Sequence, residues 1–164
     1  MPKLNKCIEA LLESYNNRGH INPAGEANLP SKRSIESILR ELTELLLPGF
    51  GEMESLDHNK LSLITAERVN KAVRNLEQEV EKSVAFGLRL EGKSNESFRG
   101  CRAGAEILVT SFFNELPAIR LLLEKDIRAA LDGDPAAKSI EEVILSYPGL
   151  EAIMVHRMAH FFLG

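Results

Sequence analysis

The sequence contains no tryptophan, only two cysteines and few aromatic residues, which make up 5% of its 164 positions. Cys7 and Cys101 share no metal-ligand spacing, so the sequence does not indicate a cysteine-based metal centre. Each cysteine lies in an otherwise helical apolar pattern, which predicts a small core or half-buried residue. This usage is typical of a protein from a reducing compartment.

Long apolar runs are also absent. No stretch approaches the roughly eighteen apolar residues that a membrane-spanning helix needs. The N-terminal segment MPKLNKCIEALLES carries charges within every turn, unlike a secretory signal peptide. The sequence therefore predicts a cytoplasmic protein with no membrane partner.

The chain lacks an excess of positive charge. Its net charge is −4 and its pI is about 5.6, so no general basic field is available to hold a phosphate backbone. A loosely basic middle is interleaved with acids, and we interpret it as a solvated face of mixed charge. No nucleic-acid partner is expected. The basic residues are Lys71, Arg74, Lys82, Arg89, Arg99 and Arg102, and the acidic residues are Glu67, Glu77, Glu79, Glu81, Glu91 and Glu96.

Several enzyme signatures are missing as well. The sequence has no phosphate-cradling glycine loop, no Gly-x-Ser-x-Gly elbow and no pair of Cys-x-x-Cys motifs. Because these motifs are absent, the sequence does not indicate the reactions that they carry out.

Helical periodicity is what the sequence does contain. Apolar residues recur at spacings of three and four, and no stretch alternates apolar and polar residues for long enough to propose a sheet. With 44% hydrophobic residues, the chain suits one compact unit. We predict an all-α fold, a bundle of about six to seven helices. Either Ser31 or Ser34 should cap the second helix, and Asp57 or Asn59 the third. The expected helices span about 4–17, 32–47, 59–90, 97–115, 117–131, 140–146 and 150–163.

Three sequence features set the helix boundaries near the end of the chain. Pro117 suits the first turn of a helix, so a break is expected at about Leu116. The run Ser139-Ile-Glu-Glu142 matches a capping box, in which the serine hydroxyl and the second glutamate each accept a free N–H. A short helix should begin just after that serine. Tyr147-Pro148-Gly149 should end it, and Leu150 to Leu163 should form the last helix.

His156 and His160 lie one helical turn apart, which is the geometry of half a zinc site. The glutamate that follows the first histidine in zinc proteases is missing, and no third ligand is indicated. The pattern favours a structural or interfacial role for both histidines. A zinc-binding helical protein is the alternative hypothesis.

Arg157 and Asp134 are two further candidates. Arg157 could bind an anion or a carboxylate, but a salt bridge with Glu141, Glu142 or Glu151 is favoured. Asp134 precedes a proline, which pushes its backbone toward an extended conformation. Residue chemistry alone favours a turn residue there, whose side chain closes a local turn.

Four short runs follow one another near the C-terminus: Asp134–Ala137, Ser139–Glu142, Tyr147–Ala152 and His156–His160. In this order they resemble the end of the N-terminal helical domain of bacterial serine O-acetyltransferases. The resemblance is specific over about Leu116 to Phe162. Over the rest of the chain it extends only to the number of helices.

This resemblance implies a function for the parent protein. Members of the family transfer acetyl from acetyl-CoA to the hydroxyl of L-serine and give O-acetylserine for cysteine synthesis. Their helical domain drives the assembly of trimers into hexamers. It precedes a left-handed β-helix of hexapeptide repeats, which supplies the catalytic histidines and the acetyl-CoA site. The aspartate of the Asp-Pro motif belongs to the serine pocket, and the matching residue here is Asp134.

The sequence departs from the family in one large respect, because it contains no hexapeptide repeats. We therefore expect residues 1–148 to form the helical domain and residues 149–164 a linker helix toward a β-helix that is not in this chain. No catalytic, cofactor-binding or metal-binding residue is expected, and His156, Arg157 and His160 are assigned to support or interface. The chain should be inactive by itself. In the family, cysteine feedback and partnership with O-acetylserine sulfhydrylase depend on the missing regions. A stand-alone helical protein-protein interaction module is the alternative function.

Overall fold

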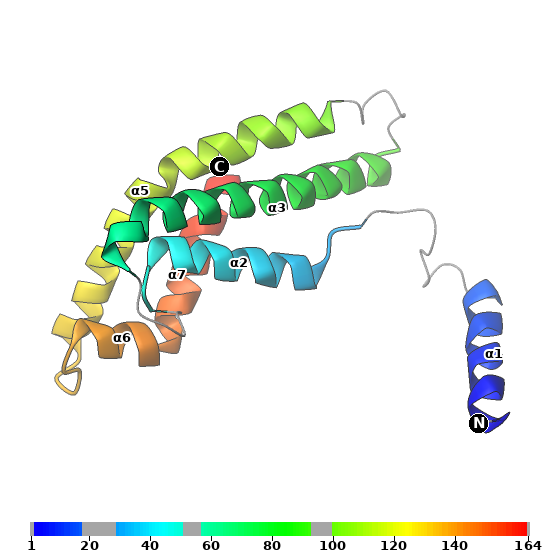
Figure 1. Ribbon diagram of the computed structural model, residues 1–164, viewed down its shortest axis with the longest axis horizontal. Helices are drawn as coiled ribbons and strands as arrows, with labels where there is room; N and C mark the ends of the chain where they lie inside the picture. Colours follow the sequence, from blue (N-terminus) through cyan, green and yellow to red (C-terminus); the bar gives the residue numbers. More distant parts are fainter. Residues whose placement is uncertain (1, 18–28, 51–56, 93–99, 164) are drawn as a thin grey trace.

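The computed structural model describes residues 2–17, 29–50, 57–92 and 100–163. All regular structure within these residues is helical, so the all-α prediction is confirmed, and their six α-helices agree with the predicted number. The helices are arranged as Figure 1 shows. They are α1 (Pro2–Asn17), α2 (Lys32–Leu46), α3 (Leu61–Leu90), α5 (Cys101–Gly133), α6 (Ile140–Ser146) and α7 (Pro148–Leu163), with a 3-10 turn η2 (His58–Lys60) before α3.

The core lies where α2, α5, α6 and α7 meet, with α3 packed against both α2 and α5. Residues spaced four apart form the buried stripe of α2, namely Ile38, Leu42 and Leu46. Ile35, about one turn earlier on the same helix, is 44% exposed. Phe112 and Val143 are fully buried and anchor α5 and α6 in this core. The core therefore combines the apolar face of α2 with those of α5, α6 and α7, which come much later in the chain.

Helix α5 runs unbroken through Pro117, so the predicted break at Leu116 is wrong. Proline removes one N–H and crowds the carbonyl four residues earlier, which usually bends a helix. Figure 1 shows such a change of direction between the yellow-green and yellow halves of α5. Leu116 and Ile119 are buried on either side of the exposed proline, so packing holds the two halves in one bent helix.

The start of α5 can be compared with the sequence-based prediction only in part. The predicted start at Ser97 lies outside the described residues, and the helix is present from Cys101. Cys101 is buried, as expected, whereas Cys7 on α1 is exposed, which corrects the prediction of a core or half-buried thiol.

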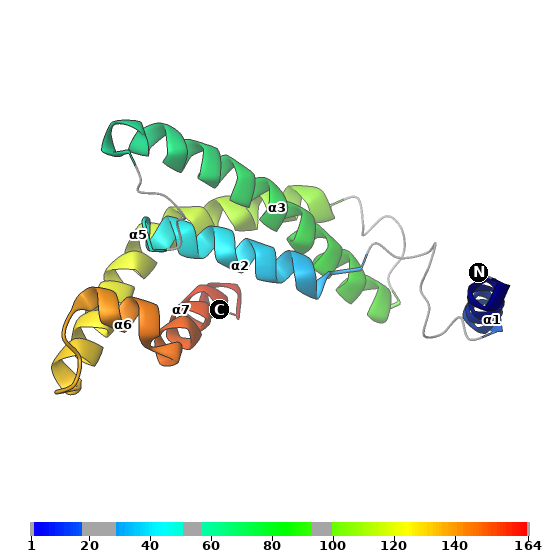
Figure 2. The ribbon, with the colours of Figure 1, turned by 60° about the horizontal axis from the view of Figure 1, so that its bottom comes forward.

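Helix α1 lies apart from the other helices in both views (Figures 1 and 2). Every described side chain of this helix is exposed. Within the residues that the structure describes, nothing covers its apolar stripe: Leu4, Ile8, Leu11, Leu12 and Tyr15 are between 47% and 64% exposed.

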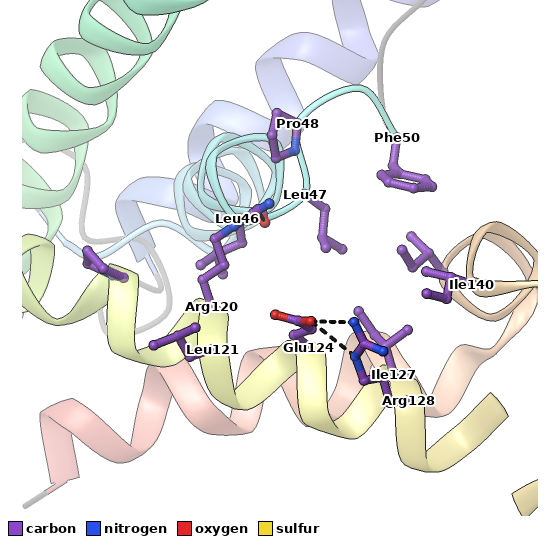
Figure 3. A pocket seen from close by; sticks show the side chains of 12 residues that line it. Leu46, Leu47, Pro48, Phe50, Arg120, Leu121, Glu124, Ile127, Arg128 and Ile140 are labelled. Atoms are coloured by element: carbon purple, nitrogen blue, oxygen red, sulfur yellow. Dashed lines mark hydrogen bonds and ion pairs between the residues drawn. The ribbon is translucent and has the colours of Figure 1, made fainter. Parts of the chain in front are cut away.

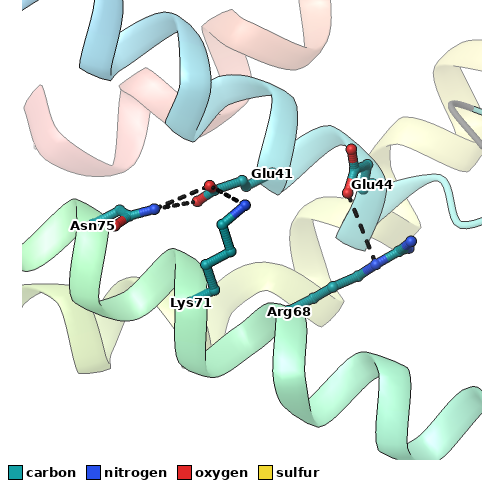
Figure 4. Close-up of polar contacts among 5 residues, drawn as sticks. All are labelled: Glu41, Glu44, Arg68, Lys71 and Asn75. Carbon is teal, nitrogen blue, oxygen red and sulfur yellow. Dashed lines mark hydrogen bonds and ion pairs between the residues drawn. The ribbon is translucent and has the colours of Figure 1, made fainter.

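Charged residues of α3 pair with acids of α2 across the helix interface (Figure 4). The Glu41 carboxylate accepts hydrogen bonds from the Asn75 amide at 2.9 and 3.0 Å and contacts the Lys71 ammonium at 2.9 Å. Arg68 lies 3.8 Å from the carboxylate of Glu44. The mixed-charge middle is therefore partly an interface between helices rather than only a solvated face.

Glu79 is the clearest correction to that interpretation, because it is only 5% exposed. Its carboxylate accepts a hydrogen bond from the Ser31 backbone N–H at 3.0 Å and contacts the Lys82 ammonium at 2.6 Å. Ser31 is the N-cap of α2, with its hydroxyl 3.4 Å from the Ser34 N–H, which settles the choice between the two predicted caps. Glu79 thus ties α3 to the start of α2.

The C-terminal helices follow the predicted pattern with small shifts. Ser139 caps α6 by accepting from the Glu142 N–H at 3.2 Å, but the Glu142 carboxylate accepts from Lys138 rather than from the capping serine. Tyr147 alone separates α6 from α7, which begins at Pro148, two residues before the predicted start. Among the described helices, none combines the length and the apolar character that crossing a membrane requires.

Candidate functional site

Asp134 follows the last residue of α5 and has an extended backbone, with φ −114° and ψ 104°. Its Oδ1 atom accepts the backbone N–H of Ala136 at 2.9 Å, and its carbonyl accepts the N–H of Ala137 at 3.0 Å. These bonds close a local turn around the Asp-Pro step. The sequence-based prediction of a turn residue at Asp134 is therefore confirmed.

A second contact holds the other oxygen of the same carboxylate. The Tyr147 hydroxyl donates a hydrogen bond of 2.5 Å to Asp134 Oδ2, from thirteen residues further along the chain. In the sequence, Tyr147 is recognisable only as part of a helix break, and its contact with Asp134 was not predicted. No spacing rule could have found it, because the contact exists only once α6 brings the start of α7 beside the end of α5.

The contacts move the pKa values of both groups further from neutral pH. The Tyr147 hydrogen bond, followed by the Ala136 N–H, holds the pKa of Asp134 below its usual value of 3.8. The same hydrogen bond raises the pKa of Tyr147 to about 12. At neutral pH Asp134 is therefore a carboxylate and Tyr147 a neutral donor.

The Asp134 carboxylate retains capacity for a further partner. An ionised carboxylate has about four acceptor positions, and the turn and the tyrosine use two of them. The side chain is half-buried, so solvent reaches it. Chemically, such a group can accept hydrogen bonds from a cationic donor such as an ammonium ion.

Arg157 makes a two-pronged ion pair from α7 to α5. Its Nε and Nη2 atoms donate to the two oxygens of Asp126 at 2.5 and 2.6 Å. The expected salt bridge is present, but its partner is none of the three glutamates predicted from nearby sequence. The physical reason is that α7 folds back along α5, which brings a residue 31 positions earlier opposite Arg157. The pair supports the helix packing that places Tyr147.

His156 and His160 lie on an exposed face of α7. Their rings are stacked, with centroids 6.2 Å apart and an interplanar angle of 25°. In the part of the chain that the structure describes, no group of three or more His, Cys, Asp or Glu side chains is arranged to hold a metal ion. The structure thus places the two histidines on one face of α7, as their spacing predicts.

A pocket of about 450 Å³, which the sequence did not predict, lies between the end of α2, the second half of α5 and α6 (Figure 3). Its walls are mainly apolar, and its polar groups already have partners. The Arg120 guanidinium donates to the Leu46 carbonyl at the end of α2, and Arg128 pairs with Glu124 at 2.8 Å. Asp134 does not line this pocket. The pocket has no arrangement of nucleophile and base that would indicate a reaction.

The chain is similar in sequence to several serine acetyltransferases. No protein-family model matches the sequence. A plasmid-encoded serine acetyltransferase of Synechococcus elongatus is 33% identical over 133 residues, which cover 80% of this chain and 41% of that protein. The serine acetyltransferases of Bacillus pumilus and Bacillus subtilis are 54% identical over 41 residues and 56% identical over 39 residues. These matches cover 25% and 24% of this chain, and 19% and 18% of the two relatives.

The chain therefore spans about two fifths of the length of the cyanobacterial relative and less than a fifth of the two Bacillus proteins. The resemblance to serine acetyltransferases that the four C-terminal runs indicated is confirmed by these similarities.

Proposed function

We propose that this chain is the helical part of a serine O-acetyltransferase, a protein that transfers acetyl from acetyl-CoA to the hydroxyl of L-serine. The observation that carries the proposal is the 33% identity over 133 residues to the cyanobacterial relative. The all-helical fold supports it. Acetyl-CoA is the cosubstrate of the parent enzyme, and this chain alone is expected to be inactive, since its sequence contains no hexapeptide repeats.

Within this function, Asp134 is proposed to bind the ammonium group of serine. The carboxylate is ionised, half-buried and fixed by two donors, and it keeps acceptor positions for a charge-assisted hydrogen bond. A carboxylate of low pKa is a poor base, so its contribution is to position serine rather than to take a proton. Arg157 and the two histidines of α7 have supporting or interfacial roles in this proposal.

The Asp134→Asn variant tests this assignment in a full-length acetyltransferase that contains the chain. Loss of a charge-assisted hydrogen bond, worth about 1.5–3 kcal/mol, should raise the serine KM roughly tenfold to a hundredfold. The acetyl-CoA KM should change less than about twofold. Steady-state kinetics with each substrate varied in turn provide the measurement.

Asp132→Asn is the matched control, because it makes the same charge change at an exposed residue two positions earlier. The 164-residue chain provides a further arm, in which no O-acetylserine should form. Equal effects of Asp134→Asn on both KM values would contradict the serine-binding role. Formation of O-acetylserine by the chain alone at the rate of the full enzyme would contradict the proposal that this chain is inactive by itself.

The proposal includes self-association through the helical part, with a second copy of the chain as the partner. The exposed apolar stripe of α1 supports this step, because about 16 residues of isolated helix are only marginally stable in water. A groove of about 450 Å³ between α2, α3, α5 and α7 provides another apolar surface. Ile35, Val84 and Phe162 on its walls are each about 40% exposed.

Light scattering on the 164-residue chain tests this association. At tens of micromolar we expect a mass at least twice the 18.2 kDa of one chain. Ile8→Lys should shift the protein toward monomer, since it places a charge in the apolar stripe, whereas Glu9→Lys on the polar face should not. A monomeric wild-type chain would contradict association and favour the alternative of an interaction module for a different protein.

The remaining parts of the proposal follow from the same family assignment. We place the parent enzyme in the cytoplasm, in the pathway of cysteine synthesis. Its partnership with O-acetylserine sulfhydrylase is assigned to the tail beyond the β-helix, outside the present 164 residues.

A further inference from the structure

We propose that Tyr147 is a positioning residue, which fixes the Asp134 carboxylate in the orientation that receives the ammonium group of the substrate. The hydrogen bond of 2.5 Å from the Tyr147 hydroxyl to Asp134 Oδ2 is the geometric basis. The inference rests on the proposed role of Asp134 in serine binding and deepens it.

The surroundings of Tyr147 hold its phenol in place. Tyr147 is the single residue between α6 and α7, and its N–H donates to the Val143 carbonyl at 3.2 Å. Its own carbonyl accepts the Leu150 N–H at 3.0 Å. Val143 and Leu150 are buried at 0% and 6% exposure, so the corner is anchored in the core on both sides. The hydroxyl is therefore presented from a rigid position.

The Tyr147 hydroxyl holds the carboxylate oxygen of Asp134 that the local turn does not hold. The turn holds only Oδ1, through the Ala136 N–H, which leaves the carboxylate free to rotate about its last bond. The second donor holds Oδ2 and so fixes the carboxylate plane. A carboxylate that is ordered before the substrate arrives loses less conformational freedom on binding.

A purely structural role is the competing explanation, because the same hydrogen bond joins the end of α5 to the start of α7. Loss of such a brace would lower stability and weaken the binding of both substrates together. A positioning role makes a different prediction. Without the hydroxyl, the serine KM alone should rise, because the Asp134 carboxylate loses its fixed orientation.

Tyr147→Phe in the full-length enzyme tests the inference, since it removes the hydroxyl and keeps the ring. We expect the serine KM to rise about three- to tenfold and the acetyl-CoA KM to change less than twofold. Ser146→Ala is a matched control, because it removes a hydroxyl at the exposed residue next to Tyr147 in the sequence.

The outcomes separate this inference from the proposed function. If Asp134→Asn raises the serine KM while Tyr147→Phe leaves it unchanged, the positioning role of Tyr147 is overturned and the serine-binding role of Asp134 stands. If Asp134→Asn leaves the serine KM unchanged, the serine-binding role of Asp134 fails. Titration of the Asp134 carboxyl by NMR in the 164-residue chain is independent of activity. Its pKa should be higher in Tyr147→Phe than in wild type, and an unchanged pKa would overturn the inference.

Discussion

Phe112→Ala is expected to lower the free energy of unfolding of the 164-residue chain by about 3–5 kcal/mol, the range for removing a buried aromatic ring. Phe112 on α5 is fully buried. Its ring packs against Phe161 and Phe162 of α7, with centroids 5.4 and 4.8 Å away, and against Phe113 at 5.7 Å. The variant therefore leaves a cavity at the contact between these two helices.

Urea denaturation followed by far-ultraviolet circular dichroism measures this loss. Domains of ordinary stability unfold with about 5–15 kcal/mol, so the variant should lose a large share of its stability. Ile107→Ala is the control on the same helix, because Ile107 is 70% exposed, and it should change the stability by less than about 0.5 kcal/mol. A cost below about 1 kcal/mol for Phe112→Ala would contradict the described packing of α7 on α5.

The number and placement of helices were predictable because local rules determine them. Apolar spacing and capping residues act within four positions, and the helices of residues 32–46 and 140–146 begin after predicted serine caps. The predicted cap of α3, Asp57 or Asn59, is wrong, because this helix begins after Lys60 and has no side-chain cap. Pro117 shows the limit of such rules. The sequence marks the position where the helix is disturbed, but only the burial of Leu116 and Ile119 decides that the helix bends rather than ends.

The candidate site likewise combines a local contact that the sequence predicts with contacts between distant residues that it does not. Asp134 was predictable as a turn residue, because the turn is made with the next three residues. Its serine-binding role stays a prediction that rests on resemblance. The partners of Asp134 and Arg157 lie 13 and 31 residues away, and no periodicity encodes them. Those contacts depend on how α6 and α7 fold back on α5.

Charge burial was the least predictable feature. In the sequence Glu79 resembles its neighbours Glu77 and Glu81, which share its stretch of mixed charge. Only the approach of α2 distinguishes it, because the N-terminus of that helix brings the Ser31 N–H to its carboxylate. A buried carboxylate is tolerated when donors replace its water, and here a backbone N–H and the Lys82 ammonium do so.

Glu79→Gln is therefore expected to destabilise the chain by about 2 kcal/mol at neutral pH. The glutamine keeps the volume and one oxygen for the Ser31 N–H but places a neutral amide against the Lys82 ammonium. The Glu79 side chain is only 7% exposed, so water cannot replace the lost ion pair effectively. Glu67→Gln makes the same charge change at an exposed position of α3 and should cost less than about 0.5 kcal/mol.

The pH dependence of that difference identifies its electrostatic origin. Burial by itself raises the pKa of Glu79, but the hydrogen bonds from Lys82 and Ser31 and the charge of Lys82 outweigh it, and the pKa lies below the usual value of 4.5. A carboxylate whose pKa is lower in the folded state stabilises that state fully above the unfolded pKa. The stability gap between wild type and Glu79→Gln should thus be constant near neutral pH and shrink as the pH falls below 4.5 through the folded pKa. A gap that stayed constant across this acidic range would mean that Glu79 stabilises α3 against α2 through shape alone.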